Sequence, residues 1–154
     1  MAKGTIVSNV KDAIAVSSTI VESAKNELVW IFSPAMLALL VQFSIPSKSK
    51  MLIEKGGRVR GITKISGTNR DVVRKLLNNG EEVRHIDQFR GIFMVVGDKR
   101  ESISLINVNI EDLTLDDEIV GFWTDDQVYS DYLIATFEAA WNEAVDAEAR
   151  LREL

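Results

Sequence analysis

An uncharged run over residues 28–47 constrains the fold more than any other feature of this sequence, because it is long enough to cross a membrane as a helix. Pro34 divides the run, and Gln42 and three serines interrupt its apolar character. We therefore interpret residues 27–32 as a buried parallel strand and residues 35–43 as the helix that follows it. In this interpretation we expect no contact with a membrane, and the alternative is that residues 35–43 lie on a membrane surface.

The alternation of strands and helices predicts a single α/β domain over residues 1–154. It would consist of an N-terminal helix (5–25), a sheet domain (27–123) and a C-terminal helix (125–154). We expect a mixed, largely parallel sheet with helices on both faces. Its further strands are expected at residues 58–64, 82–86, 92–97, 102–110 and 120–123, with a short helix at 69–78.

Composition excludes several kinds of chemistry. The chain has no cysteine, so it has no disulfide, thiolate metal site or cysteine nucleophile, and this composition suits the cytoplasm. Its net charge of −5 disfavours direct binding of nucleic acid. With one histidine and no calcium-loop or phosphate-loop pattern, the sequence predicts neither a metal nor a cofactor.

The C-terminal helix carries a heptad pattern. Thr124 and Gln127 fit a capping box at its start. Apolar residues then recur in four-three alternation: Leu133, Phe137, Ala140, Ala144, Ala147, Leu151 and Leu154. We expect the first part to pack on the sheet and Ala147, Leu151 and Leu154 to form a dimer interface, although these last residues could instead complete the core.

Polar residues follow the predicted parallel strands at the edge of the sheet where ligands bind in such folds. The candidate ligand-binding residues are Thr63, Ser66, Thr68, Asn69, Arg84 and His85. Arg84 near a helix N-terminus would favour an anionic or polyhydroxyl ligand. His85 alone is more typical of a structural hydrogen-bonding residue than of a catalyst, because catalysis needs a partner in suitable geometry.

Four short segments resemble one half-unit of the phospholipase-D-like superfamily. They are residues 57–63 (GRVRGIT), 79–85 (NGEEVRH), 93–99 (FMVVGDK) and 121–124 (GFWT), the last followed by Phe137 and Trp141. Active members carry a nucleophilic histidine, a lysine two residues later and an aspartate seven residues after the histidine. If Asp98 is that aspartate, the other two positions are Gly91 and Phe93, so both functional residues are missing. Counting from His85 instead places Asp87 and Ile92 at these positions, which also fails.

The resemblance implies a phospholipase-D-like fold without its activity, since no covalent phospho-intermediate can form without the nucleophile. Members of this superfamily that lack the catalytic residues are similar to the sensory domains of microbial transcription regulators and signalling kinases. We therefore expect a non-catalytic domain that binds a small ligand or a protein partner and signals through a homodimer to a fused or separate DNA-binding or kinase module. The alternative is a phosphodiesterase or nuclease with a relocated active site that uses His85.

Overall fold

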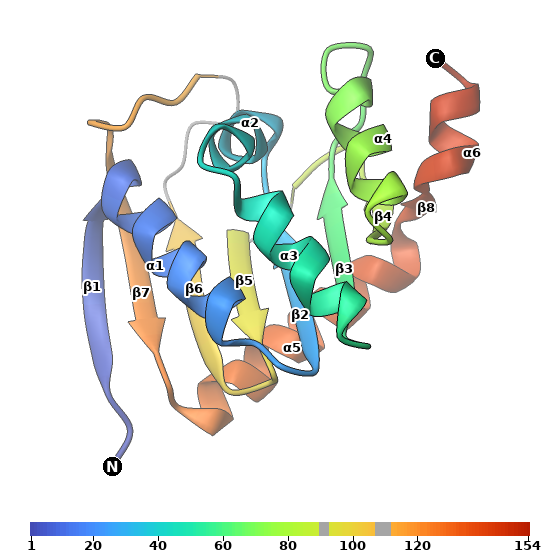
Figure 1. The fold of residues 1–154 in the computed structure, drawn as a ribbon. Helices are drawn as coiled ribbons and strands as arrows, with labels where there is room; N and C mark the ends of the chain where they lie inside the picture. The colour runs from blue at the N-terminus through green and yellow to red at the C-terminus, as the bar shows by residue number, and fades with distance from the viewer. Residues whose placement is uncertain (90–92, 107–111) are drawn as a thin grey trace.

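The computed structural model describes residues 1–89, 93–106 and 112–154. Its strands form one sheet in the order β1-β7-β6-β5-β2-β3-β4-β8 (Figure 1). The strand bounds are β1 (Gly4–Asn9), β2 (Glu27–Ile31), β3 (Arg58–Thr63), β4 (Glu82–His85), β5 (Phe93–Gly97), β6 (Glu101–Ile106), β7 (Glu118–Thr124) and β8 (Val145–Asp146).

The prediction of a largely parallel sheet is wrong. Among the described strands only the pairs β2–β3 and β3–β4 are parallel, and the remaining neighbours are antiparallel. The connections explain this difference, since a parallel pair needs a crossover while a short turn makes an antiparallel hairpin. Asp98, Lys99 and Arg100 form such a turn between β5 and β6, with φ values of 53° at Asp98 and 56° at Lys99.

Helices cover both faces of the sheet, as predicted. The helices α1 (Val10–Ser23), α2 (Pro34–Gln42), α3 (Ile45–Glu54) and α4 (Arg70–Asn78) lie on one side, and α5 (Gln127–Glu143) lies on the other (Figure 1). The uncharged run forms β2, α2 and the start of α3, whose apolar side chains enter the core. In the part of the chain that the structure describes, no helix has both the length and the apolar character of a membrane span.

The N-terminal helix begins later than the predicted 5–25. The segment Gly4–Asn9 is strand β1, which pairs antiparallel with β7 at the edge of the sheet. Its β-branched residues Thr5, Ile6 and Val7 favour an extended backbone. Asn9 then caps α1 by accepting a hydrogen bond from the backbone N–H of Asp12 at 2.8 Å.

The predicted continuous helix 125–154 is also wrong. Helix α5 ends at Glu143, β8 follows, and a separate short helix α6 (Ala147–Arg152) completes the chain. Asp146 breaks the helix because its carboxylate caps α6, and β8 pairs with β4. At the start of α5 the cap is Asp126, not Thr124, whose hydroxyl instead donates to the carbonyl of Lys3.

Two of the three predicted interface residues lie inside the fold. Ala147 is 0% exposed and Leu151 is 5% exposed, whereas Leu154 is 42% exposed. Ala147 and Leu151 therefore complete the core beside β4, which is the alternative that the sequence left open for them.

A carboxyl group is buried in the core under the helices α1–α4. Glu81 is 4% exposed, and Trp30 Nε1 donates to its Oε1 at 3.0 Å. The indole lies across Gly61, where a Cβ atom would come within 1.8 Å of Trp30 Cε2. The surrounding cavity of about 30 Å³ has no other ionisable residue among its described lining residues. Burial raises the pKa of Glu81 to about 7, although the hydrogen bond from Trp30 opposes this shift.

We expect Glu81→Gln to remove a pH-dependent loss of stability, which arises because the folded protein buries an ionisable carboxyl group. An unfolded glutamate ionises near pH 4.5, so the folded state of the wild type holds the extra proton between about pH 4.5 and 7. The stability of the wild type relative to Glu81→Gln should therefore fall as pH rises through this window, by about 3 kcal/mol in total. Urea unfolding at a series of pH values measures this difference, and parallel curves for the two proteins would contradict it.

Leu151 and Leu154 provide a matched test of the C-terminal packing. Leu151→Glu places a carboxylate in the core and should lower the free energy of unfolding by several kcal/mol. Leu154→Glu lies at an exposed position and should change it by no more than about 0.5 kcal/mol. Denaturant unfolding and light scattering on both variants check this. If Leu151→Glu dissociated an oligomer without changing the free energy of unfolding, Leu151 would belong to a subunit interface and not to the core.

Candidate functional site

A cavity of about 710 Å³ opens between α5 and the carboxyl ends of β2 and β4. Its volume lies within the range of small-molecule sites. The segment after β4 and the start of β5 form one side, and one stripe of α5 forms the other. The lining residues are Ile31, His85, Ile86, Asp87, Gln88, Phe89, Phe93, Thr136, Ala139, Ala140, Glu143 and Val145.

Of the predicted ligand-binding residues, only His85 lines this cavity. Arg84 pairs with Ile62 and His85 with Thr63, so the two neighbours point to opposite faces of the sheet. Arg84 faces α5, where its guanidinium lies 4.2 Å from the centre of the Trp141 ring and donates to the Trp141 carbonyl at 2.8 Å. Thr63, Ser66, Thr68 and Asn69 lie in or beside the loop between β3 and α4.

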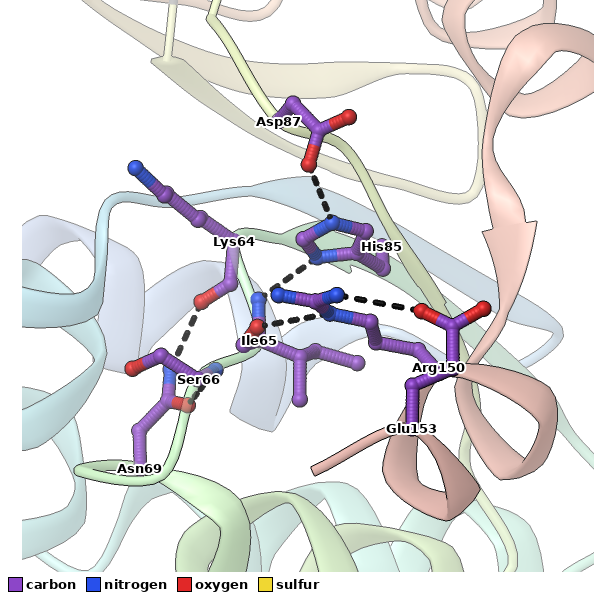
Figure 2. Close-up of polar contacts among 8 residues, drawn as sticks. All are labelled: Lys64, Ile65, Ser66, Asn69, His85, Asp87, Arg150 and Glu153. Carbon is purple, nitrogen blue, oxygen red and sulfur yellow. Dashed lines mark hydrogen bonds and ion pairs between the residues drawn. The ribbon is translucent and has the colours of Figure 1, made fainter.

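Three side chains hold that loop, and we name them the loop clamp: Asn69, His85 and Arg150 (Figure 2). The Asn69 amide donates to the carbonyl of Lys64 at 2.9 Å and accepts from the N–H of Ser66 at 2.9 Å. Arg150 Nε donates to the carbonyl of Ile65 at 3.1 Å. Two members of the loop clamp, Asn69 and His85, are thus predicted ligand-binding residues that bind backbone groups instead.

The hydrogen bonds of His85 define its tautomer. The backbone N–H of Ile65 donates to Nδ1 at 2.8 Å, so Nδ1 carries the lone pair and Nε2 carries the proton in the neutral ring. Nε2 then donates to Asp87 Oδ1, also at 2.8 Å. This hydrogen bond lowers the pKa of Asp87. Neither ring nitrogen has a lone pair free for attack.

The positions of the missing catalytic motif are equally informative. Gly91 lies outside the described residues. Phe93 begins β5, is 6% exposed, and packs edge-to-face on Phe89 with ring centres 4.9 Å apart. It therefore places an aromatic wall where the resemblance implies a lysine.

Asp98 lies at the other end of β5, away from the cavity. Its carboxylate accepts hydrogen bonds from the N–H groups of Lys25, Asn26 and Glu27 at 2.8 to 3.0 Å. Burial opposes ionisation, but these three donors lower the pKa of Asp98 overall. Asp98 thus fixes the connection between α1 and β2 to the β5–β6 turn.

The cavity offers little for catalysis. The ionisable residues of its described lining are His85, Asp87 and Glu143, and Thr136 provides a hydroxyl group. No group of three potential metal ligands occurs within the described ranges. The geometry suits binding through apolar contact and a few polar groups.

Sequence reasoning missed most of this site. Asp87, Gln88 and Phe89 directly follow a predicted strand, which is a usable signal in an α/β sheet. Thr136, Ala139, Ala140 and Glu143 recur at three- and four-residue steps and so share one face of α5. Nothing in the sequence shows that this face of α5 meets the segment after β4.

Sequence comparison gives no family for this chain: no protein-family model matches it, and no curated protein does. Solved structures do match. The archaeal chromatin protein TrmBL2, described as showing a novel mode of DNA binding, superimposes with a TM-score of 0.73 at 16% identity. The match covers 94% of this chain and 54% of TrmBL2, so this chain spans about half the length of that protein.

Two further matches cover nearly the whole of both chains. Nuc from Salmonella typhimurium, a phospholipase D family member, matches with a TM-score of 0.71 at 14% identity over 95% of this chain and 98% of its own. NucT from Helicobacter pylori matches with a TM-score of 0.72 at 12% identity over 95% and 99%. At these identities the likeness shows the fold alone, and the fold of this chain is phospholipase D-like.

Proposed function

We propose that this chain is a non-catalytic, phospholipase D-like regulatory domain that binds a small ligand in the cavity beside α5. The observation that supports this most directly is the pair of hydrogen bonds made by His85, which leave neither ring nitrogen available as a nucleophile. The cavity itself has the size and the mixed lining of a ligand site.

Phosphoryl transfer needs more than a nucleophile. The charge that develops on the phosphoryl oxygens must be stabilised by cations or hydrogen-bond donors in the site. Phe93 stands where the resemblance implies the lysine, and no Lys or Arg is among the described lining residues. Repulsion by Asp87 and Glu143 would further disfavour a phosphodiester.

The alternative, a phosphodiesterase that uses His85, requires this ring to leave its position. Attack through Nδ1 would break the hydrogen bond from Ile65, and attack through Nε2 would require loss of its proton while Nδ1 stays engaged. Each requirement disfavours the enzyme.

The regulatory part of the proposal rests on analogy. A domain of this fold makes up about half of TrmBL2, a DNA-binding chromatin protein, which agrees with a role beside an output module in transcription regulation or two-component signalling. We propose a homodimer as the signalling form. Its interface would lie elsewhere than Ala147 and Leu151, which are buried.

A hydrolysis assay tests the absence of catalysis. We expect wild-type protein to cleave neither bis(p-nitrophenyl) phosphate nor single-stranded DNA above the buffer rate. His85→Ala should lower the free energy of unfolding by about 1–3 kcal/mol, because it leaves the buried N–H of Ile65 without its acceptor.

His85→Asn is the matched control. Its amide oxygen can accept the same hydrogen bond, so it should lose less stability than His85→Ala. Wild-type turnover that disappears in both variants while the folded fraction stays high would contradict the proposal and favour the enzyme.

A further inference from the structure

We propose that the cavity binds a small organic cation, namely an amine or quaternary ammonium joined to an apolar or aromatic group. This inference rests on the proposed function of the cavity as a ligand site and names its ligand class. It differs from the anionic or polyhydroxyl ligand that Arg84 suggested in the sequence, because Arg84 is not among the lining residues.

The charged groups among the described lining residues are carboxylates. Asp87 and Glu143 lie on its two sides, and His85 is neutral in the tautomer that its hydrogen bonds require. Asp87 uses one oxygen for His85, and its side chain is 86% exposed. Glu143 forms no hydrogen bond or ion pair with any of the described residues. Two carboxylates are therefore available to a positive group.

Among the residues that the structure describes, the nearest basic side chains have other partners or lie outside the cavity. Arg84 is stacked on Trp141, and Arg150 binds the carbonyl of Ile65 and the carboxylate of Glu153. Lys64 and Arg150 are close enough to help lower the pKa of Asp87, but neither lines the cavity. They reduce the negative field at Asp87 without supplying a contact for an anion.

The rest of the lining suits an apolar body. Phe89 and Phe93 form an edge-to-face pair, and Ile31 and Ile86 extend the same apolar surface. Aromatic rings also attract cations through their negative faces. A lining that combines apolar side chains with two exposed carboxylates favours an amine joined to a ring over a phosphate or a carboxylate.

Three probes of similar shape and different charge test this: phenethylamine, 2-phenylethanol and 3-phenylpropionate. Each would be titrated into the wild type by calorimetry, while backbone amide NMR shifts locate the bound probe. We expect phenethylamine to bind most tightly, 3-phenylpropionate most weakly, and the shifts to centre on residues 85–89 and 136–143.

Charge removal provides the control. Asp87→Asn with Glu143→Gln should weaken phenethylamine about fivefold or more, which is what two exposed ion pairs supply, and leave 2-phenylethanol unchanged. Asp71→Asn with Glu148→Gln removes the same charge at exposed positions outside the cavity and should leave all three probes unchanged.

The outcomes separate this inference from the proposed function. Equal binding of all probes, or tightest binding of 3-phenylpropionate, would overturn the ligand class while leaving a non-catalytic ligand site in place. Absence of shifts at the lining residues with every probe would overturn the cation site. Turnover in the hydrolysis assay would instead overturn the proposed function.

Discussion

Successive residues of a β-strand point to opposite faces of the sheet, and at the end of β4 this alternation separates Arg84 from His85. Arg84 packs under α5 against Trp141, while His85 binds the loop that leaves β3. The predicted ligand site, which combined Arg84 with His85, therefore does not form. The same parallel register brings Thr63 beside His85, so the loop starts within reach of the imidazole ring.

The residue types that suggest chemistry in this chain serve its backbone instead. His85, Asn69 and Arg150 hold the loop after β3, and Asp98 holds the connection before β2. Buried backbone groups need such partners, because an unpaired one costs free energy comparable to a lost hydrogen bond. The cavity is left with aromatic and acidic groups, which agrees with the binding role that we propose.

The sequence predicted the central strands well, because β2 and β5 are mainly apolar runs and because glycine or turn residues lie beside β3 and β4. It failed where pairing over long distances decides the structure. Residues 5–9 fit the helical pattern, yet the segment Gly4–Asn9 forms β1 because it pairs with β7. The heptad pattern after Leu133 predicted one continuous helix, whereas Asp146 caps a separate helix and β8 pairs with β4. The cavity could not be predicted, since it depends on where α5 crosses the sheet.

The state of the His85 ring is the central claim of this account, and it can be measured directly because the chain has no other histidine. Nitrogen-15 NMR of the imidazole distinguishes the two neutral tautomers and the imidazolium. The structure predicts the neutral ring with its proton on Nε2, together with a slowly exchanging N–H of Ile65. A ring protonated on Nδ1, or a rapidly exchanging Ile65 amide, would show that His85 is free of the loop and would contradict the account.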